Sequence, residues 1–224
     1  MLRHPKVIIV ATVVLAAVVA AGFFLAVNIR RLRQEAREAT CRGKLCQMAL
    51  AIRNYSADFG SLPPAYLVDS RGLRAHSWRV LVLPYLEWQE QELYKRYSFS
   101  EPWNGPTNRL AVDSGPADVG LGYFRCPDDS DLSGQCTSIL CVVGPQTFWP
   151  GSGTVPSDAL TNNPKSILLV ALPKTGIHWL EPKDITIEEL RSLLATSDSP
   201  VFFVTADGTS GILEGNEPDC KIQK

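Results

Sequence analysis

The residues best suited to bind a metal ion are His76, His178 and Glu181. The chain has three histidines in all, and His4 lies in the basic N-terminus, so the rest of the chain cannot supply a three-histidine site. His178 and Glu181 lie in a segment flanked by Pro and Gly, and their spacing differs from the His-Glu-x-x-His pattern of zinc hydrolases. We therefore expect no metal site here, and we expect these side chains to make hydrogen bonds that stabilise turns.

An acidic loop is the second candidate for ion binding. Residues 129–134 place side-chain oxygens at alternate positions before Gly134, as in the first half of a calcium loop. The twelfth position is Leu140, where an EF-hand has a bidentate Glu, so an EF-hand is excluded. Two interpretations of Asp128 to Asp131 stay open, a looser oxygen cage for Ca²⁺ and a solvated acidic loop.

The sequence holds no complete catalytic motif. A Gly-x-Ser-x-Gly elbow is missing, and Asp58-Phe59-Gly60 stands without the other loops of a kinase, so we interpret it as the end of a helix. The tryptophans are Trp78, Trp88, Trp103, Trp149 and Trp179. They are of a type that lines grooves for sugars or peptides, but we favour anchoring in the core or in loops. We therefore assign no catalytic residue, no metal ligand and no cofactor, and we expect no enzymatic activity.

Residues 7–27 form a run of 21 residues without a charge. As a helix with a rise of ~1.5 Å per residue, the run spans about the ~30 Å hydrocarbon core of a bilayer. The alternative is a signal peptide cleaved after Ala21, but the run continues through Phe23 and Val27, beyond the usual length of such a segment. We expect an uncleaved transmembrane helix that follows a short basic N-terminus, residues 1–6.

The orientation of this anchor has two opposing signals. Arg3 and Lys6 precede the span, whereas a larger group of basic residues follows it: Arg30, Arg31, Arg33 and Arg37. The count of Lys and Arg alone favours a cytoplasmic body. The six cysteines favour an oxidising compartment instead, because disulfides persist there, and they permit any of 15 connectivities.

The composition is that of a globular domain, with 45% apolar and 20% charged residues. The charge is uneven, because residues 1–60 carry a net charge of +6 and residues 61–224 carry −7. An acidic body argues against nucleic acid as a partner.

Residues 28–59 form an amphipathic stem helix in this interpretation. A stripe of apolar side chains recurs there at spacings of three and four: Cys41, Leu45, Met48, Ile52 and Tyr55. Gly60 and the following Pro63-Pro64 end the helix. The transmembrane helix is thus predicted to extend into a helix that packs on the body.

Residues 60–224 are predicted to form an α+β head. A second helical region spans residues 76–97, with Ser77 as a cap and Pro84 between two short helices. Short β-rich runs follow at residues 139–143, 167–172 and 201–205, and Asp207-Gly208 predicts a hairpin through a type I′ turn. Two helices on one side of a small, mostly antiparallel sheet is the expected arrangement.

A series of short stretches carries a resemblance to a known family. They are REA at 37–39 with Cys41 and Leu45, AIRNY at 51–55, FGSLPPAY at 59–66, HSWRVLVLPYLE at 76–87, SEPW at 100–103, FRCP at 124–127, VGP at 143–145, GIHWLEP at 176–182 and ADG at 206–208. In this order they resemble the large set of planctomycete-type proteins of unknown function that begin like type IV prepilins and end in an Asp-Gly motif.

The resemblance implies a pseudopilin-like architecture, in which a long N-terminal helix carries a small sheet-containing head outside the cytoplasmic membrane. It therefore favours an external body. It also implies a disulfide between Cys41 and Cys126, the two cysteines that lie in the family-like stretches.

The N-terminus departs from a prepilin leader. Prepilins have Gly before Phe at the start of the apolar helix and a Glu soon after, whereas Gly22-Phe23-Phe24 lies near the end of this span and the first acidic residue is Glu35. We therefore expect no leader processing.

Together these patterns predict a single-pass, membrane-anchored, pseudopilin-like envelope protein with a structural or protein-interaction role. The membrane and pseudopilin or secretion-system-like proteins are the expected partners. The alternative is an anchored extracytoplasmic module that binds a small ligand or Ca²⁺.

Overall fold

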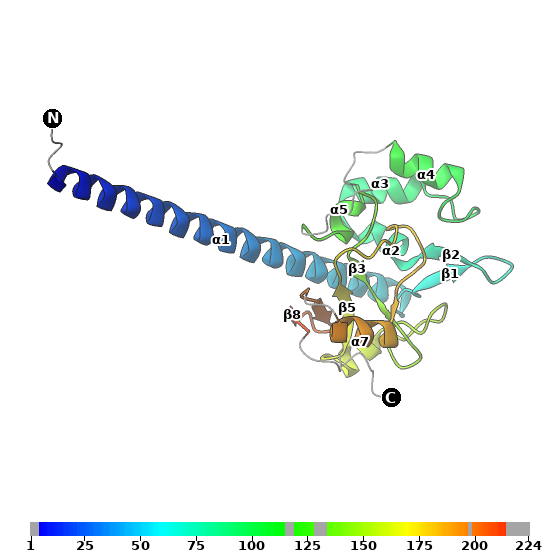
Figure 1. Cartoon of the computed structure of the whole chain (residues 1–224). Coiled ribbons are helices and arrows are strands. Elements are labelled where there is room, and N and C mark those ends of the chain that lie inside the picture. Colours follow the sequence, from blue (N-terminus) through cyan, green and yellow to red (C-terminus); the bar gives the residue numbers. More distant parts are fainter. Residues whose placement is uncertain (1–4, 115–118, 128–133, 197–198, 214–224) are drawn as a thin grey trace. The chain divides into compact units, whose positions relative to one another are not determined.

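The computed structural model of the chain describes residues 5–114, 119–127, 134–196 and 199–213. The chain divides into two compact units, residues 1–39 and residues 40–224, which we call the anchor unit and the head. The first element, α1 (Pro5–Phe59), contributes residues to both units. Figure 1 shows the elements along the chain.

The anchor unit holds the apolar part of α1 and the charged residues that follow it up to residue 39. Within the described residues, one helix is long and apolar enough to span a membrane, and its most apolar window has a mean hydropathy of 2.7 with none of it buried. This agrees with the predicted apolar run at residues 7–27 and is consistent with a single-pass anchor.

The head contains the C-terminal part of α1, and the predicted apolar stripe lies in its core. Cys41, Leu45, Met48 and Ile52 are buried, and Tyr55 is half-buried. The helix ends at Phe59 because Gly60 adopts a φ of +70°, which glycine tolerates without steric cost. The stem helix and its end are therefore confirmed.

The head has seven further helical segments among the described residues. They are α2 (Trp78–Leu81), the 3₁₀ segment η1 (Leu83–Tyr85), α3 (Trp88–Arg96), α4 (Pro106–Asp113), α5 (Leu121–Phe124), α6 (Asp158–Asn162) and α7 (Ile187–Thr196). In Figure 1, α3 and α4 lie on one side of the head and α7 lies on the other.

In the part of the chain that the structure describes, the strands form one sheet of four strands and two pairs. They are β1 (Tyr66–Val68), β2 (Arg74–Ser77), β3 (Ile139–Leu140), β4 (Val142–Val143), β5 (Ile167–Ala171), β6 (Ile185–Thr186), β7 (Phe202–Thr205) and β8 (Ser210–Ile212). The large sheet has the order β3-β5-β7-β8 and is antiparallel throughout. The pair β1-β2 is antiparallel and the pair β4-β6 is parallel. The predicted α+β class with a mostly antiparallel sheet is confirmed.

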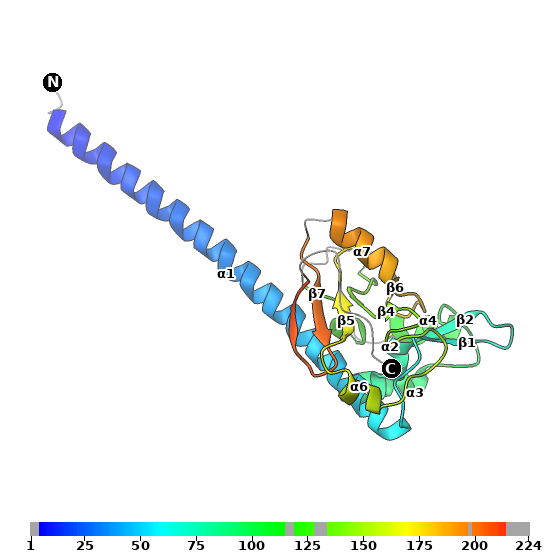
Figure 2. The same cartoon turned by 90° about the horizontal axis from the view of Figure 1, so that it is seen from below.

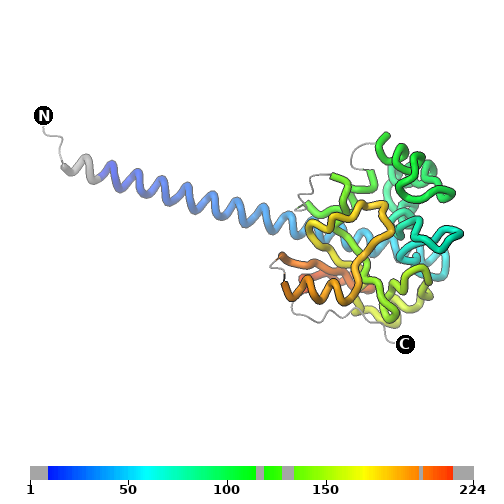
Figure 3. The backbone as a smooth tube through the Cα atoms, turned by 45° about the vertical axis from the view of Figure 1, so that its right-hand side comes forward, coloured from blue at the N-terminus to red at the C-terminus, as the bar shows by residue number. Residues whose placement is uncertain are grey.

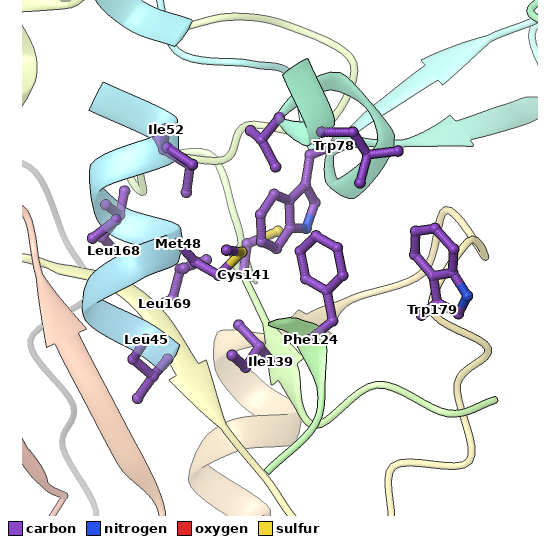
Figure 4. Packing of buried hydrophobic residues seen from close by; sticks show 14 of the residues in the cluster. Leu45, Met48, Ile52, Trp78, Phe124, Ile139, Cys141, Leu168, Leu169 and Trp179 are labelled. Carbon is purple, nitrogen blue, oxygen red and sulfur yellow. The ribbon is translucent and has the colours of Figure 1, made fainter. Parts of the chain in front are cut away.

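The four-stranded sheet separates two hydrophobic clusters, because alternate strand residues face opposite sides. Leu169 on β5 and Val204 on β7 pack in the same cluster as Met48 of α1. Val170 on β5 packs in the second cluster, with Leu190 of α7. All five residues of β5 are buried, as expected for a strand covered on both faces. Figure 2 shows α7 and the sheet from below, and Figure 4 shows the first cluster from close by.

The second predicted helical region proves more divided than expected. Its first residues, His76 and Ser77, end strand β2, and Ser77 caps α2 by accepting a hydrogen bond from the Arg79 backbone N–H. Pro84 lies in η1, between α2 and α3 as predicted. These segments contribute Trp78 and other residues to the cluster of α1, whereas α7 on the opposite face was not predicted.

The Asp207-Gly208 hairpin joins β7 and β8, as predicted. Gly208 has a φ of +87°, but Asp207 does not share this left-handed conformation, so the predicted type I′ turn is wrong. The backbone N–H groups of Thr205 and Gly208 donate to the carbonyls of Thr209 and Thr205 at 2.9 and 3.0 Å. The loop therefore has three residues, with glycine in the position that requires a positive φ.

Candidate ligand-binding cleft

A cleft of about 440 Å³ opens on the head where segments distant in sequence meet. One wall comes from α4 and the residues before it, and the other comes from residues 135–136 and 176–181. The polar lining consists of Asn104, Arg109, Asp113, Gln135, His178 and Glu181, and the larger apolar lining residues are Trp103, Val112 and Leu180. Two of the three residues considered for metal binding, His178 and Glu181, therefore lie in one cleft.

The α4 wall is fixed by Asn108, which is fully buried at the start of the helix. Its side-chain amide donates to the carbonyls of Ser98 and Pro102 at 2.9 and 3.0 Å, and its Oδ1 accepts from the Ser98 N–H at 2.7 Å. Glu101 Oε1 accepts from the Asn108 backbone N–H at 2.8 Å. These bonds join α4 to the loop that carries Trp103 and so position both parts of this wall.

The opposite wall is held by backbone pairing between two loops. The N–H of Thr137 donates to the carbonyl of Ile177 at 2.9 Å, and the N–H of Trp179 donates to Gln135 at 3.0 Å. Cys136 and His178 face each other in this antiparallel bridge. Figure 3 traces the long connection from β5 to β6 that brings residues 176–181 to this place.

The hydrogen bonding of His178 defines its tautomer. Its Nδ1 accepts from the backbone N–H of Leu180 at 3.2 Å, so the proton of the neutral ring lies on Nε2. Burial lowers the pKa of His178, the Arg109 guanidinium lowers it further, and Asp113 acts in the opposite direction. The ring packs against the indole of Trp103 with centroids 5.1 Å apart. Near neutral pH, His178 is therefore an uncharged N–H donor beside an aromatic wall.

His76 does not line the cleft and has different partners. Its Nε2 lies 3.2 Å from the carbonyl of Phe99, which only accepts, so Nε2 donates and Nδ1 accepts from the Tyr97 hydroxyl at 2.9 Å. Burial lowers the pKa of His76 and raises that of Tyr97. His76 thus ties β2 to the segment after α3, in the stabilising role expected from the sequence.

The residues considered for ion binding do not converge on a metal site in the described part of the chain. No group of three or more His, Cys, Asp or Glu side chains able to hold a metal occurs among these residues. The acidic loop from Asp128 to Asp131 lies outside the described residues.

The tryptophans have three kinds of surroundings. Trp78, Trp149 and Trp179 are fully buried, and Trp78 lies against Trp149 with ring centroids 5.3 Å apart. Trp179 stacks on Phe124 with ring centroids 5.7 Å apart, and Figure 4 labels both residues. Trp103 lines the cleft and Trp88 is exposed. The expectation of core anchoring holds for the three buried rings, whereas Trp103 is placed where it can contact a ligand.

A disulfide joins Cys41 on α1 to Cys126 after α5, as the family resemblance implied. It closes a sequence separation of 85 residues. Cys46 is half-buried, whereas Cys141 is fully buried and burial raises the pKa of its thiol far above the ordinary value. Cys220 lies outside the described residues.

A buried ion pair lies in the core of the head, and no local pattern in the sequence indicates it. Arg79 Nη2 donates to Asp184 Oδ1 at 2.6 Å, and both side chains are almost completely buried. The same oxygen accepts from the backbone N–H of Cys141 at 2.9 Å and from Trp78 Nε1 at 3.3 Å. The guanidinium also donates to the carbonyl of Ile139 at 2.9 Å. The pair therefore links α2, β3, the residue between β3 and β4, and the segment before β6.

The carboxylate of Asp207 is used within its own turn. It pairs with Lys165 at 2.7 Å and accepts from the Thr205 hydroxyl at 2.6 Å and the Thr209 N–H at 3.1 Å. These bonds, that of Lys165 first, hold the pKa of Asp207 well below its usual range. The carbonyl of Ala206 accepts from Arg53 of α1 at 3.3 Å. The Asp-Gly turn is thus fastened to the stem and has a structural explanation.

These features define a class of protein, in which an α+β head with a polar cleft is joined to one N-terminal helix apolar enough to span a membrane. The chain belongs to the family SBP_bac_10, described as a protein of unknown function (DUF1559), whose model matches residues 30–166. The match includes Trp103 and α4 of the cleft but not His178 or the Asp207-Gly208 turn. No curated protein and no solved structure matches the chain.

Proposed function

We propose that this protein is a single-pass, pseudopilin-like component of the cell envelope with a structural or protein-interaction role. In this proposal the helix spans the cytoplasmic membrane without leader processing, and the head lies outside the cytoplasm. No catalytic residue is assigned. The histidine in the cleft, His178, uses Nδ1 to accept from the Leu180 N–H, so this nitrogen is not available as a general base.

The main support for the proposal is that the two parts of α1 differ in burial. The apolar window of the helix has no buried residue, whereas Leu45, Met48 and Ile52 have no exposed surface at all. One helix thus supplies both a surface suited to lipid and the central packing element of the head. A helix with these two parts is what an anchored pseudopilin-like subunit requires.

The Cys41–Cys126 disulfide supports the external orientation. Disulfides persist in oxidising compartments and are rare in the cytosol. The excess of Arg after the span points the other way, but it is a statistical tendency of sequences. A disulfide persists only where the compartment is oxidising, so we give the disulfide more weight.

Capture of partners from membranes tests the interaction role. The tagged full chain is cross-linked in cells and purified beside a control in which residues 7–27 are replaced by an unrelated transmembrane helix. We expect pilin-like or secretion-machinery proteins to be enriched with the native chain. If neither sample enriches such a protein, the pseudopilin-like role is wrong.

The cleft favours a second candidate function, an anchored module that binds a small ligand. Its volume of about 440 Å³ lies in the usual range for ligand pockets, and polar side chains from two walls converge on it beside Trp103. The two functions are compatible, because the cleft and α1 use different surfaces of the chain.

A further inference from the structure

We propose that the cleft binds a neutral, polyhydroxylated ring, the chemistry of a pyranose sugar. The inference rests on the second candidate function above and names its class of ligand. It is carried by the donors and acceptors that the two walls present and by the aromatic surface of Trp103 in one of them.

Several polar groups of the cleft are available for a ligand. Within the described residues, the side chains of Asn104, Arg109, Asp113 and Glu181 make no hydrogen bond or ion pair, although all four line the same space. The bonds of Asn108 hold α4 and its Arg109 and Asp113 in place. A ligand would therefore meet groups whose hydrogen-bonding capacity is not already used by the protein.

The cleft contains side chains of both charges, and this mixture disfavours a ligand with a net charge. Arg109 supplies one positive charge, and Asp113 and Glu181 supply two negative charges around the same cleft. An anion would meet the carboxylates and a cation would meet the guanidinium, so each would face repulsion as well as attraction. A hydroxyl group donates to a carboxylate and accepts from a guanidinium, so it suits both.

The remaining walls fit a ring. His178 offers an N–H donor at Nε2, because its Nδ1 is occupied by the Leu180 N–H. Trp103 is half-buried and supplies a flat apolar surface beside this donor, with Val112 and Leu180 nearby. A pyranose has an apolar C–H face and a rim of hydroxyls, which matches one aromatic wall surrounded by polar groups.

A zwitterionic amino acid is the main competitor for this charge pattern. Its binding would depend on ion pairs with Arg109 and Asp113, and both side chains are exposed. Ion pairs between exposed groups contribute little in water. We therefore favour the neutral ring and make the amino acid an outcome of the test.

The test uses the full chain in lipid nanodiscs, because glycosidic detergents would compete for the site. Saturation-transfer NMR and calorimetric titration are performed with D-glucose, D-galactose, N-acetyl-D-glucosamine, cellobiose and L-leucine. We expect at least one of the sugars to bind with a millimolar or lower Kd and L-leucine not to bind. Binding of L-leucine alone would show that the class of ligand is wrong while the cleft remains a ligand site.

Matched variants locate the binding. Asp113→Ala should weaken sugar binding roughly threefold to tenfold, since it removes one hydrogen-bond acceptor from the cleft. Asp158→Ala, which removes an exposed carboxylate from α6, should leave the affinity unchanged. A sugar affinity that survives both Asp113→Ala and Trp103→Leu would place the site elsewhere and overturn the proposal. Absence of binding by every probe would overturn the second candidate function as well, whereas the partner capture described above would be unaffected.

Discussion

Removal of Asp184 should destabilise the head more than removal of any exposed carboxylate. Asp184→Ala leaves the guanidinium of Arg79 fully buried without its counter-charge, which typically costs about 3–5 kcal/mol. It also removes the acceptor of the Cys141 N–H and of Trp78 Nε1, and each unsatisfied donor adds to the loss. We expect the free energy of unfolding to fall by about 4 kcal/mol or more and the Tm by about 10 °C.

Urea denaturation of the full chain in detergent micelles, followed by tryptophan fluorescence, measures this loss. Glu92→Ala is the control, because Glu92 and Lys95 also lie 2.6 Å apart but both are exposed. The control should change stability by less than about 1 kcal/mol. Asp184→Asn keeps one acceptor oxygen and should fall between the two. If Asp184→Ala costs no more than the control, burial does not make this ion pair important for stability.

Three further perturbations have defined outcomes. Gly208→Val should lower the free energy of unfolding by more than about 1 kcal/mol, because φ is +87° at this position. Asp207→Asn keeps the acceptor oxygen for the Thr209 N–H and should lower it by less than about 1 kcal/mol. Thermal melts that rank the two variants in the reverse order would contradict this. Replacing Cys41 and Cys126 together by Ser should lower the urea midpoint by the equivalent of about 4 kcal/mol, and an unchanged midpoint would show that the disulfide is not formed. Burial lowers the pKa of His76, so below pH 6.5 the unfolded chain binds a proton that the folded chain does not bind, and stability should fall as the pH drops. His76→Gln should reduce this dependence of stability on pH. Denaturation at a series of pH values measures it, and equal slopes for the two proteins would contradict the prediction.

Local patterns in the sequence predicted the elements whose causes are themselves local. The stripe from Cys41 to Ile52 repeats with the helical period, so its burial followed once the body provided a surface to pack on. The hairpin at Asp207-Gly208 was predicted because glycine supplies the positive φ that a tight reversal requires. The exact turn was wrong because loop length, which the sequence does not show directly, selects the turn type.

Features that depend on distant residues were not predicted. Arg79 and Asp184 are 105 positions apart, and nothing near either one marks it as buried. The cleft combines α4 with residues 135–136 and 176–181, so its lining appears only when both loops pair. Helix α7 was not predicted, although its apolar residues have helical spacing, because it is short and lies between two β-rich segments. Asn108 gave no signal, because a buried Asn looks like any loop Asn until its partners are known.

Labelling of Cys46 tests whether the helix anchors a head that lies outside the cytoplasm, as we propose. This half-buried cysteine is not in the disulfide. Intact cells that express the full chain with Cys220→Ser are treated with a membrane-impermeant maleimide, beside lysed cells and a Cys46→Ser control. We expect Cys46 to be labelled in intact cells while Cys41 and Cys126 stay oxidised. Labelling of Cys46 that occurs only after lysis, with Cys41 and Cys126 reduced, would place the head in the cytoplasm and show that the proposed orientation is wrong.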